Sequence, residues 1–489
     1  MPDRTEGLWP AGDPRSVAVP ADADADAGTS SLEARIARAE PGAALRAAEV
    51  ADRAAEDRVV DDGAAEDRGM VVDDAPPASG RIGREDAEQL TVVSFSHAVQ
   101  HFYPAGLAVA YPFVVAGLHV SYGMLGLVLG IAGVVGGLLQ GLAALASRFS
   151  ARLLLSVQNF GLAIVSLLGA IAPSFGLFGA ARCIGNAVSW PQHPVGSAVL
   201  TRRFPKRRAY ALSWHVAGGS IGTAVVPLVV SALIASYGWR WGVGVLAIPL
   251  AIGGALVAWK LRDPGAGDRA GEPGSAPVGA RAHLESIRLL LRRRETAGAI
   301  LAGTIAAGGR GLGTLTVFVP AYLKSGLQLG TVTVGALFTA LLVGSILGPV
   351  AAGYVADRLG RRRVLVAVYV VGAATIVGFV SVGADVAALG GVGFLVGVFA
   401  YSESPLIQAV FSEGLAGLDV QGSFGYYFAI SYGVGSVWTI ALGAIIDTAG
   451  FRWAFDVMAL SFVGAALVVL WARPAPPPVG PLGRPPSDH

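Results

Sequence analysis

Long apolar runs of about 20 residues recur along the chain from about Thr91 onward, separated by short polar or charged segments. A helix needs roughly 20 apolar residues to cross a bilayer core about 30 Å thick. The pattern therefore predicts an all-α membrane protein with twelve transmembrane helices. We place these helices near residues 91–116, 122–146, 152–172, 175–200, 209–236, 240–260, 296–321, 330–356, 364–384, 387–411, 423–446 and 453–472.

Three polar segments flank and divide these runs. Residues 1–88 are rich in Ala, Asp, Glu and Arg, so they cannot bury enough apolar surface to form a core. We expect disordered cytoplasmic tails at 1–88 and 474–489. Residues 262–294 are a cytoplasmic linker that ends in a basic amphipathic helix, of the kind that lies on a membrane surface. The linker separates an N-terminal six-helix half, 89–261, from a C-terminal half, 295–473.

Composition agrees with a bilayer environment and narrows the possible functions. Hydrophobic residues make up 53% of the chain and charged residues only 14%, whereas soluble domains carry roughly 25% charged residues. The single Cys183 excludes a disulfide framework and a cysteine-based metal site. No G-x-x-x-x-G-K-[ST] motif for ATP binding occurs, so the proton motive force is the expected energy source. We expect no cofactor and no nucleic-acid partner.

Arginine and lysine gather on one side of the predicted membrane. Because positive loops stay in the cytoplasm, we expect both termini in the cytoplasm and a multi-pass protein of the cell membrane. The loops on that side contain Arg148, Arg152, Arg202, Arg203, Lys206, Arg207, Arg208, Lys260, Arg262, Arg292–Arg294, Arg358 and Arg361–Arg363, against Arg240, Lys324 and Arg452 on the other.

The two groups of six predicted helices also repeat each other in sequence. The run Gly-Trp239-Arg-Trp recurs as Gly-Phe451-Arg-Trp, and Trp190-Pro-Gln192-His-Pro aligns with Tyr401-Ser-Glu-Ser-Pro at nearly the same offset. This repetition predicts two pseudo-symmetric halves related by an axis along the membrane normal.

A glycine, an acid and a group of arginines form the segment between the predicted helices 330–356 and 364–384. The segment has the pattern Gly353-x-x-x-Asp357-Arg358-x-Gly360-Arg361-Arg362, which resembles the signature loop of the major facilitator superfamily (MFS) of secondary transporters. The resemblance covers residues from about 90 to 472. It implies the twelve-helix MFS fold and transport of a small molecule by alternating access.

In the resemblance, this loop acts as a conformational latch, in which Asp357 and the arginines pair with neighbouring helix ends. Such pairing is physically reasonable because carboxylates and guanidinium groups form bidentate hydrogen bonds. The alternative is that the arginines only anchor the loop to anionic lipid. The corresponding first-half segment, Gly141 to Arg152, has Leu145 where the acid is expected.

Two further motifs point toward proton-linked transport. Arg182-Cys-Ile-Gly185 looks like an arginine-glycine motif of proton-coupled antiporters, and Gly218 to Pro227 is similar to their glycine-proline motif, with Val226 in place of a glycine. Together with the His193-Pro-x-Gly-Ser run, the region looks most like the fosmidomycin-resistance-type branch. That branch includes exporters associated with drug resistance.

Ionisable residues deep in a membrane are costly and usually face a cavity or a partner. Arg182 and Arg310 come from opposite halves, and either could bind a carboxylate or phosphonate of a substrate. The alternative for each is pairing with a helix carbonyl or with Glu403, the deep acid. For Arg182, the resemblance to the arginine-glycine motif implies a coupling role instead of substrate contact. Glu403 is the leading candidate for proton coupling, and a permanent Glu–Arg bridge is its alternative.

Histidines and aromatic residues complete the candidate site. His97 and His101 share one helix face, and His101 or His193 could relay protons because histidine titrates near physiological pH. Packing is the alternative role for each histidine. Gln192 lies beside His193, and Trp190 and Tyr401 occupy equivalent positions that could flank a substrate. The histidine spacing matches no known metal motif, so no metal site is predicted.

These observations predict a secondary active transporter, proton-coupled and acting as a monomer, with a drug or an organic anion as substrate. Uptake or exchange of an organic anion is the alternative to efflux. A ligand sensor that does not transport is an alternative of another class. An enzyme is not expected, because no nucleophile–base pair or metal ligands converge in the sequence pattern.

Overall fold

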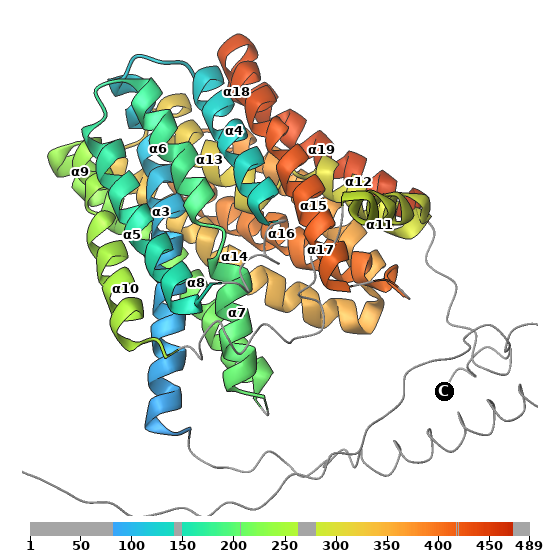
Figure 1. Cartoon of the computed structure of the whole chain (residues 1–489). Coiled ribbons are helices and arrows are strands. Elements are labelled where there is room, and N and C mark those ends of the chain that lie inside the picture. Colours follow the sequence, from blue (N-terminus) through green and yellow to red (C-terminus); the bar gives the residue numbers. More distant parts are fainter. Residues whose placement is uncertain are drawn as a thin grey trace, which may run out of the picture. The chain divides into compact units, whose positions relative to one another are not determined.

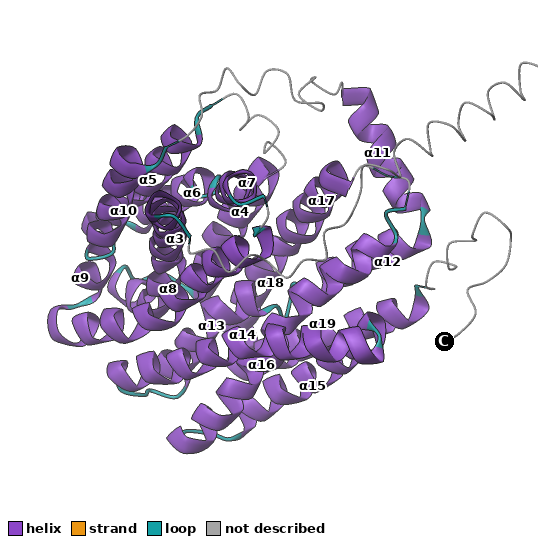
Figure 2. Cartoon of the chain, turned by 90° about the horizontal axis from the view of Figure 1, so that it is seen from below, coloured by secondary structure: helices purple, strands orange, loops and turns teal. Residues whose placement is uncertain are grey.

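The computed structural model describes residues 82–140, 149–205, 207–262, 280–416, 418 and 420–472. The chain forms two units, Met1–Arg81 and Ile82–His489, and all described residues lie in the second. Every regular element in those residues is helical (Figure 2). The predicted tail at 474–489, most of the predicted tail at 1–88 and the position of Leu145 lie outside the described residues.

The helices of the first half follow the predicted spans closely (Figure 1). In chain order they are α3 (Arg84–Gly117), α4 (Tyr122–Gln140), α5 (Ala151–Ile171), α6 (Phe175–Val188), α7 (Gln192–Arg203), α8 (Arg208–Tyr237), α9 (Trp239–Gly244) and α10 (Ala247–Lys260). Helix α3 begins at Arg84, so the last residues assigned to the disordered tail are helical instead. Ser150 and Ser174 start α5 and α6 by accepting hydrogen bonds from Leu153 N and Leu177 N.

The second half repeats this arrangement after the linker helix α11 (Ala280–Arg292), which forms where the sequence predicts an amphipathic helix. Its helical elements are α12 (Arg294–Ala306), η3 (Gly311–Leu315), α13 (Thr316–Ala321), η4 (Tyr322–Gly326), α14 (Thr331–Leu359), α15 (Arg361–Ser381), α16 (Val386–Glu413), α17 (Val420–Phe428), η5 (Ala429–Gly433), η6 (Val434–Ser436), α18 (Val437–Ala449) and α19 (Phe451–Trp471).

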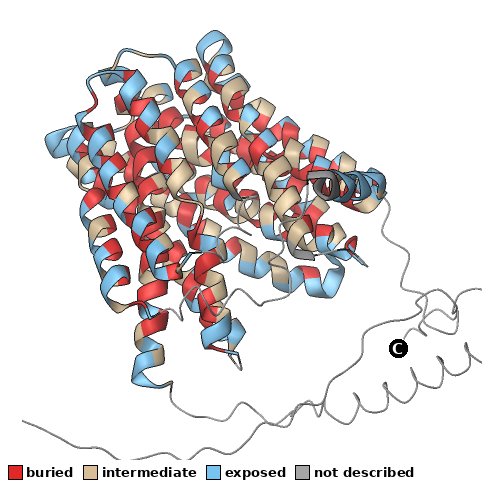
Figure 3. Cartoon of the chain, in the orientation of Figure 1, coloured by how far each residue is buried: buried red, intermediate tan, exposed pale blue. Residues whose placement is uncertain are grey.

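Nine helical segments within the described residues are long and apolar enough to cross a membrane. The other three predicted spans correspond to α3, which carries several polar side chains, and to two interrupted spans, α6–α7 and α12–η4. The predicted all-α membrane fold with two six-helix halves is confirmed. Figure 3 shows buried positions toward the interior and many exposed ones on the outer helix faces. Leu167, Ile171, Val350 and Leu467 are among the large apolar side chains left exposed, as expected where lipid covers a surface.

Four spans expected to be continuous helices are interrupted, one of them only by the short turn at Val245 and Leu246 between α9 and α10. Pro191 stands at the break between α6 and α7, where its missing N–H leaves one helical hydrogen bond unmade. After α12, Gly308 and Gly309 lead into a segment in which Leu312 and Gly313 have non-helical backbone angles. The span that begins with α17 passes through π and 3-10 turns around Gly433 and Gly435. Broken helices inside a membrane protein are tolerated where other groups form hydrogen bonds with the backbone N–H and C=O groups that the break leaves unpaired.

The two halves contact each other most clearly at the end of the bundle opposite the arginine-rich loops. There, the carboxylate of Asp447 on α18 accepts hydrogen bonds from Tyr122 N (2.9 Å) and Gly123 N (2.7 Å) at the start of α4. The Tyr122 hydroxyl donates to Ser325 Oγ at 2.7 Å, and its ring lies edge-on to Phe451. An acid at a helix N-terminus is electrostatically favourable, so this contact joins the halves firmly.

At the arginine-rich end, the described ion pairs lie within each half. Arg203 at the end of α7 binds Glu85 and Asp86 at the start of α3, both at 2.7 Å. In the second half, Arg361 binds Glu413 at 3.3 Å. The first half also has a separate hydrophobic cluster at this end, which includes Leu155 and Leu200. Each half is therefore held together independently at the arginine-rich end.

Candidate functional site

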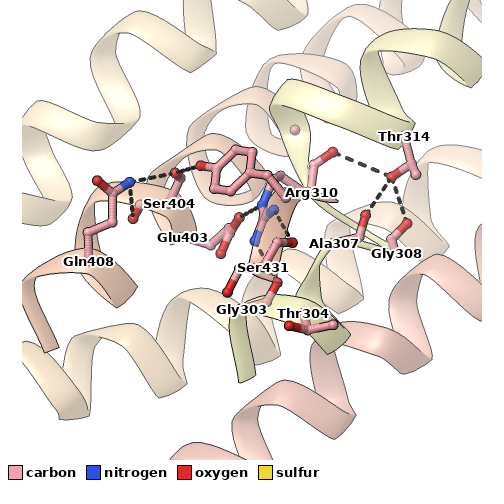
Figure 4. A network of polar contacts seen from close by, with 12 residues as sticks. Gly303, Thr304, Ala307, Gly308, Arg310, Thr314, Glu403, Ser404, Gln408 and Ser431 are labelled. Carbon is pink, nitrogen blue, oxygen red and sulfur yellow. Dashed lines mark hydrogen bonds and ion pairs between the residues drawn. The ribbon is translucent and has the colours of Figure 1, made fainter. Parts of the chain in front are cut away.

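Arg310 and Glu403 form a buried ion pair inside the second half (Figure 4). The Arg310 Nε atom lies 2.5 Å from Glu403 Oε1, and the exposed fraction is 3% for Arg310 and 0% for Glu403. The Tyr369 hydroxyl donates to Glu403 Oε2 at 3.4 Å. Glu403 comes from the middle of α16, and Arg310 comes from the break after α12. The pair therefore joins two helices that are far apart in sequence.

Arg310 also satisfies backbone carbonyls at the interrupted spans. Its Nη2 donates to the Gly303 carbonyl (2.6 Å) on α12, and its Nη1 donates to the Ser431 carbonyl (3.4 Å) on η5. The guanidinium carbon lies 4.3 Å from the centre of the Tyr432 ring. A cation beside the last turn of a helix stabilises the carbonyls there. All three nitrogens of Arg310 thus have acceptors within the protein.

Thr314 supports the same break in the chain. Its hydroxyl lies within hydrogen-bond distance of the Gly308 carbonyl (2.7 Å) and the Ala307 carbonyl (3.2 Å), which lack helical partners (Figure 4). Ser404, next to Glu403, bonds Tyr432 Oη at 2.6 Å. These contacts fix the backbone that positions Arg310, so the ion pair is held in one arrangement.

Arg182 in α6 has a different environment. Its Nε donates to the Tyr111 hydroxyl at 2.9 Å and its Nη1 donates to Asn186 Oδ1 at 2.6 Å. The guanidinium lies over the Tyr103 ring. Within the described part of the chain, its partners are all uncharged, and it belongs to neither the Arg310–Glu403 pair nor the histidine group. The sequence analysis did not single out Asn186, although it lies one helical turn from Arg182.

The histidines come together in the first half. His97 and His101 on α3 lie beside His193 on α7 and His215 on α8, with ring centres 4.1 to 5.8 Å apart. Thr223, which the sequence analysis did not name, contacts His101 Nδ1 at 3.0 Å. His97 and His101, which were expected to lie together on one helix face, are therefore joined by histidines from two further helices.

Gln192 is part of the packing around this cluster. It is fully buried, and its Oε1 accepts hydrogen bonds from Ser96 Oγ and Gln158 Nε2, both at 2.9 Å. Trp190 lies in the turn between α6 and α7. Tyr401 lies in the other half, where its hydroxyl bonds Thr316 Oγ1 at 2.7 Å and its ring packs on Gly311. No contact between Trp190 and Tyr401 occurs among the described residues.

Comparisons with known proteins agree with this helical arrangement. The sequence profile described as Major Facilitator Superfamily matches residues 93–336 and 299–487. The chain belongs to the Major Facilitator Superfamily. It is therefore a multi-pass membrane protein in a superfamily of secondary transporters.

Solved structures of other transporters have the same MFS fold. The nucleoside transporter NupG is 12% identical, with a TM-score of 0.66 over 80% of this chain and 99% of NupG. A bacterial homologue of the human lysosomal transporter Spinster, solved in an inward-facing and unoccupied conformation, is 14% identical, with a TM-score of 0.59 over 80% of this chain and 96% of its own. At such identities the likeness concerns the fold alone.

A curated relative is similar over a shorter region. The membrane sensor protein UhpC of Salmonella typhimurium is 29% identical over 119 residues, which is 24% of this chain and 26% of UhpC. The chain therefore matches about a quarter of that relative's length.

The MFS signature loop is formed as a turn between α14 and α15, with Gly360 at a φ of 92°. Arg361 reaches Glu413 at the end of α16, and Arg362 donates to the Val469 carbonyl of α19. Arg358 stacks on Tyr354, one turn earlier. These arginine contacts agree with pairing to neighbouring helix ends.

The expected role of Asp357 in these contacts is not seen in this conformation. Asp357 is exposed, as is Gly360 beside it, and Asp357 has no hydrogen-bond or ion-pair partner among the residues that the structure describes. Gly353, at the start of the motif, has open space around its Cα. A latch function for the loop remains a prediction.

Proposed function

We propose that this protein is a proton-coupled transporter that moves a small organic anion across the cell membrane by alternating access. One observation carries the choice of an anion, namely that Arg182 is a membrane-embedded cation with only uncharged partners among the described residues. A cation in that position is costly without a counter-charge. A carboxylate or phosphonate would supply the charge and accept hydrogen bonds from the guanidinium group.

Arg310 is the weaker candidate for substrate contact. Its charge is already balanced by Glu403, and its nitrogens already have protein acceptors. A substrate anion would have to displace Glu403 or a backbone carbonyl. Of the two deep arginines predicted from the sequence, Arg182 therefore supports substrate binding and Arg310 supports coupling.

Proton coupling is supported by the position of Glu403. Protonation of this carboxylate would remove the negative charge that faces Arg310, and Arg310 holds carbonyls at the breaks of two spans. Loss of the pair would thus weaken the contacts that fix α12 and η5. Proton binding and helix movement are linked through the same side chains.

The contacts between halves support alternating access. The Tyr122–Asp447 and Tyr122–Ser325 hydrogen bonds close the end opposite the arginine-rich loops. With those loops and both termini in the cytoplasm, as the positive-inside rule favours, this conformation is closed toward the outside. Export of an anionic drug would agree with the resemblance to the fosmidomycin-resistance-type branch, and anion uptake is the alternative direction.

Flux into proteoliposomes tests the proposal. We expect a panel of organic anions to include compounds that move in response to an imposed pH gradient and stop moving when a protonophore is added. Arg182→Gln should abolish that flux, whereas Arg202→Gln, which changes an exposed arginine, should leave it intact. Glu403→Gln should remove the dependence on the pH gradient. Equal flux of neutral compounds and anions, unaffected by Arg182→Gln, would contradict the proposal.

The short match to UhpC favours a second candidate, a membrane sensor. A sensor would bind its ligand without moving it. Binding of an anion to the purified protein, together with no flux of the same anion in proteoliposomes, would favour the sensor over the transporter.

A further inference from the structure

Four imidazole rings from three helices form a compact group inside the first half. The His97 ring stacks on His215 with centres 4.1 Å apart, and it lies edge-on to His101 (4.7 Å) and His193 (4.9 Å). His97 and His215 are buried, His101 is partly exposed and His193 is exposed. The group is not part of the Arg310–Glu403 pair or of the Arg182 contacts.

The hydrogen bonds around two of these rings fix where their protons lie. His97 Nδ1 is 2.7 Å from the His215 carbonyl, and a carbonyl only accepts, so Nδ1 carries the proton. His101 Nδ1 is 3.0 Å from the Thr223 hydroxyl. That hydroxyl donates its one proton to the Gly219 carbonyl, so it accepts from His101 Nδ1. In both neutral rings, Nε2 is then the nitrogen with a lone pair.

These two lone-pair nitrogens face each other. His97 Nε2 and His101 Nε2 are 3.1 Å apart, and two lone pairs at that distance repel unless a cation lies between or beside them. Two nitrogens bound to one tetrahedral zinc ion at about 2.0–2.1 Å would be about 3.3 Å apart. The observed separation is therefore close to what one metal ion would require.

We propose that His97, His101 and His193 bind a divalent transition-metal ion. One ligand atom from each of the three lies within 4.8 Å of the others, so the three imidazoles lie close enough together to share one ion. His193 has no hydrogen-bond partner among the described residues. The donors are imidazole nitrogens, which suit Zn²⁺, Ni²⁺, Cu²⁺ or Fe²⁺ better than Mg²⁺ or Ca²⁺.

The surroundings are shaped to hold these rings. A Cβ at Gly219 would lie 2.7 Å from His97 Cε1, and a Cβ at Gly196 would lie 3.0 Å from His215 Cε1. A side chain at Gly219 would therefore displace the His97 ring, and one at Gly196 would press on the His215 ring. His97 Nδ1 donates to the His215 carbonyl and His101 Nδ1 donates to the Thr223 hydroxyl. Contacts of this kind orient ligating histidines in metal sites. Sequence spacing could not reveal this site, because its rings come from two helices, α3 and α7, that are about 90 residues apart in the chain.

Metal titration of the tag-free, chelator-stripped protein in detergent tests the proposal directly. We expect Co²⁺ to bind with about one ion per chain, with visible absorption bands that Zn²⁺ removes and Mg²⁺ does not. His101→Gln and His193→Gln should each weaken Co²⁺ binding by at least about tenfold. The matched control is His119→Gln, which changes a histidine in the loop between α3 and α4, and it should bind Co²⁺ like the wild type.

Each other result would overturn the proposal. Absence of Co²⁺ binding by the wild type would do so without any variant, and it would favour a bound proton between the two Nε2 atoms. Unchanged binding in both cluster variants, or an equal loss in His119→Gln, would place the metal elsewhere. Unfolding temperature and elution volume establish that the variants fold. Because the readout is metal binding, failure here leaves the transport proposal untouched.

Discussion

The two halves of the bundle share an arrangement of helices but differ in the chemistry of their buried polar groups. The first half buries neutral side chains, among them Ser96, His97, Gln158, Asn159, Gln192 and His215. Among its described residues, the second half buries one charged pair, Arg310–Glu403, with hydroxyl groups around it. A duplicated fold can therefore be stabilised internally in two ways.

The difference in buried polar groups is clearest at the interrupted spans of each half. In the second half, a guanidinium group reaches backbone carbonyls on both α12 and η5, so charge holds two interrupted spans together. In the first half, Pro191 breaks one span, and the next residue, Gln192, is held by neutral hydrogen bonds. A buried charge is costly if it loses its partner, whereas a neutral amide is less so. The halves should thus respond differently to single substitutions.

The largest expected effect is loss of Glu403. Glu403→Leu would leave Arg310 buried without a counter-charge, which typically costs about 3–5 kcal/mol. We expect this loss in the free energy of unfolding, measured by denaturant unfolding in detergent. The double variant Arg310→Met with Glu403→Leu should recover a large part of it, because a hydrophobic replacement of the whole pair is often tolerated.

The first-half counterpart of this test is Arg182→Gln. Arg182 has no acidic partner within the described residues, so its removal leaves no opposite charge unpaired. It does take a donor from the buried Tyr111 hydroxyl, so we expect a loss of about 1–2 kcal/mol, smaller than that for Glu403→Leu. Equal destabilisation by Glu403→Leu and Arg182→Gln would show that the halves do not differ as argued here.

The second prediction concerns close packing between α14 and α16 in the second half. A Cβ at Gly397 would collide with the Leu341 carbonyl oxygen, whereas a Cβ at Gly391 on the same helix meets nothing within 4 Å. We expect Gly397→Ala to cost about 1–3 kcal/mol of unfolding free energy. The control, Gly391→Ala, should be neutral or slightly stabilising because alanine favours helix. Equal unfolding midpoints for the two variants would contradict the packing shown by the structure.

The fold could be predicted from the sequence because its signals are local. Apolar runs mark helix length, and the Gly353–Arg362 motif marks the turn between α14 and α15. The helix breaks were missed, although Pro191 and Gly308–Gly309 stand at two of them. A proline or a glycine pair leaves a segment apolar, so the segment still has the composition of a continuous span. Contacts that depend on tertiary packing were harder to predict from the sequence. The Arg310–Glu403 bridge was foreseen only as an alternative, and Thr223 beside His101 was not foreseen at all.

The third prediction tests the neutral network of the first half. Ser96 donates to Gln192 Oε1 and accepts from Asn159 Nδ2 at 2.8 Å. Ser96→Ala should therefore lower the unfolding free energy by about 1 kcal/mol, less than the loss of Glu403. Ser412→Ala is the control, because that serine is exposed and bonds only within its own helix. If Ser96→Ala lowered the unfolding free energy as much as Glu403→Leu does, the neutral network would contribute as much to stability as the ion pair.

The smallest effect is expected at the arginine-rich end of the first half, where the exposed Glu85 hydrogen-bonds to Arg203. That hydrogen bond, followed by the charge of Arg262, lowers the pKa of Glu85 below its ordinary value of 4.5. A carboxylate with a lowered pKa in the folded state adds stability at pH values above 4.5 and loses it as the pH falls through the folded-state pKa. The unfolding temperature of the wild type should thus exceed that of Glu85→Gln near neutral pH, and the two should converge on acidification. Salt should reduce the difference, because exposed charges are screened. If the difference in unfolding temperature persists in acid, Glu85 acts through packing instead of charge. The arginine-rich end of the first half would then be held by neutral contacts, like the interior of that half.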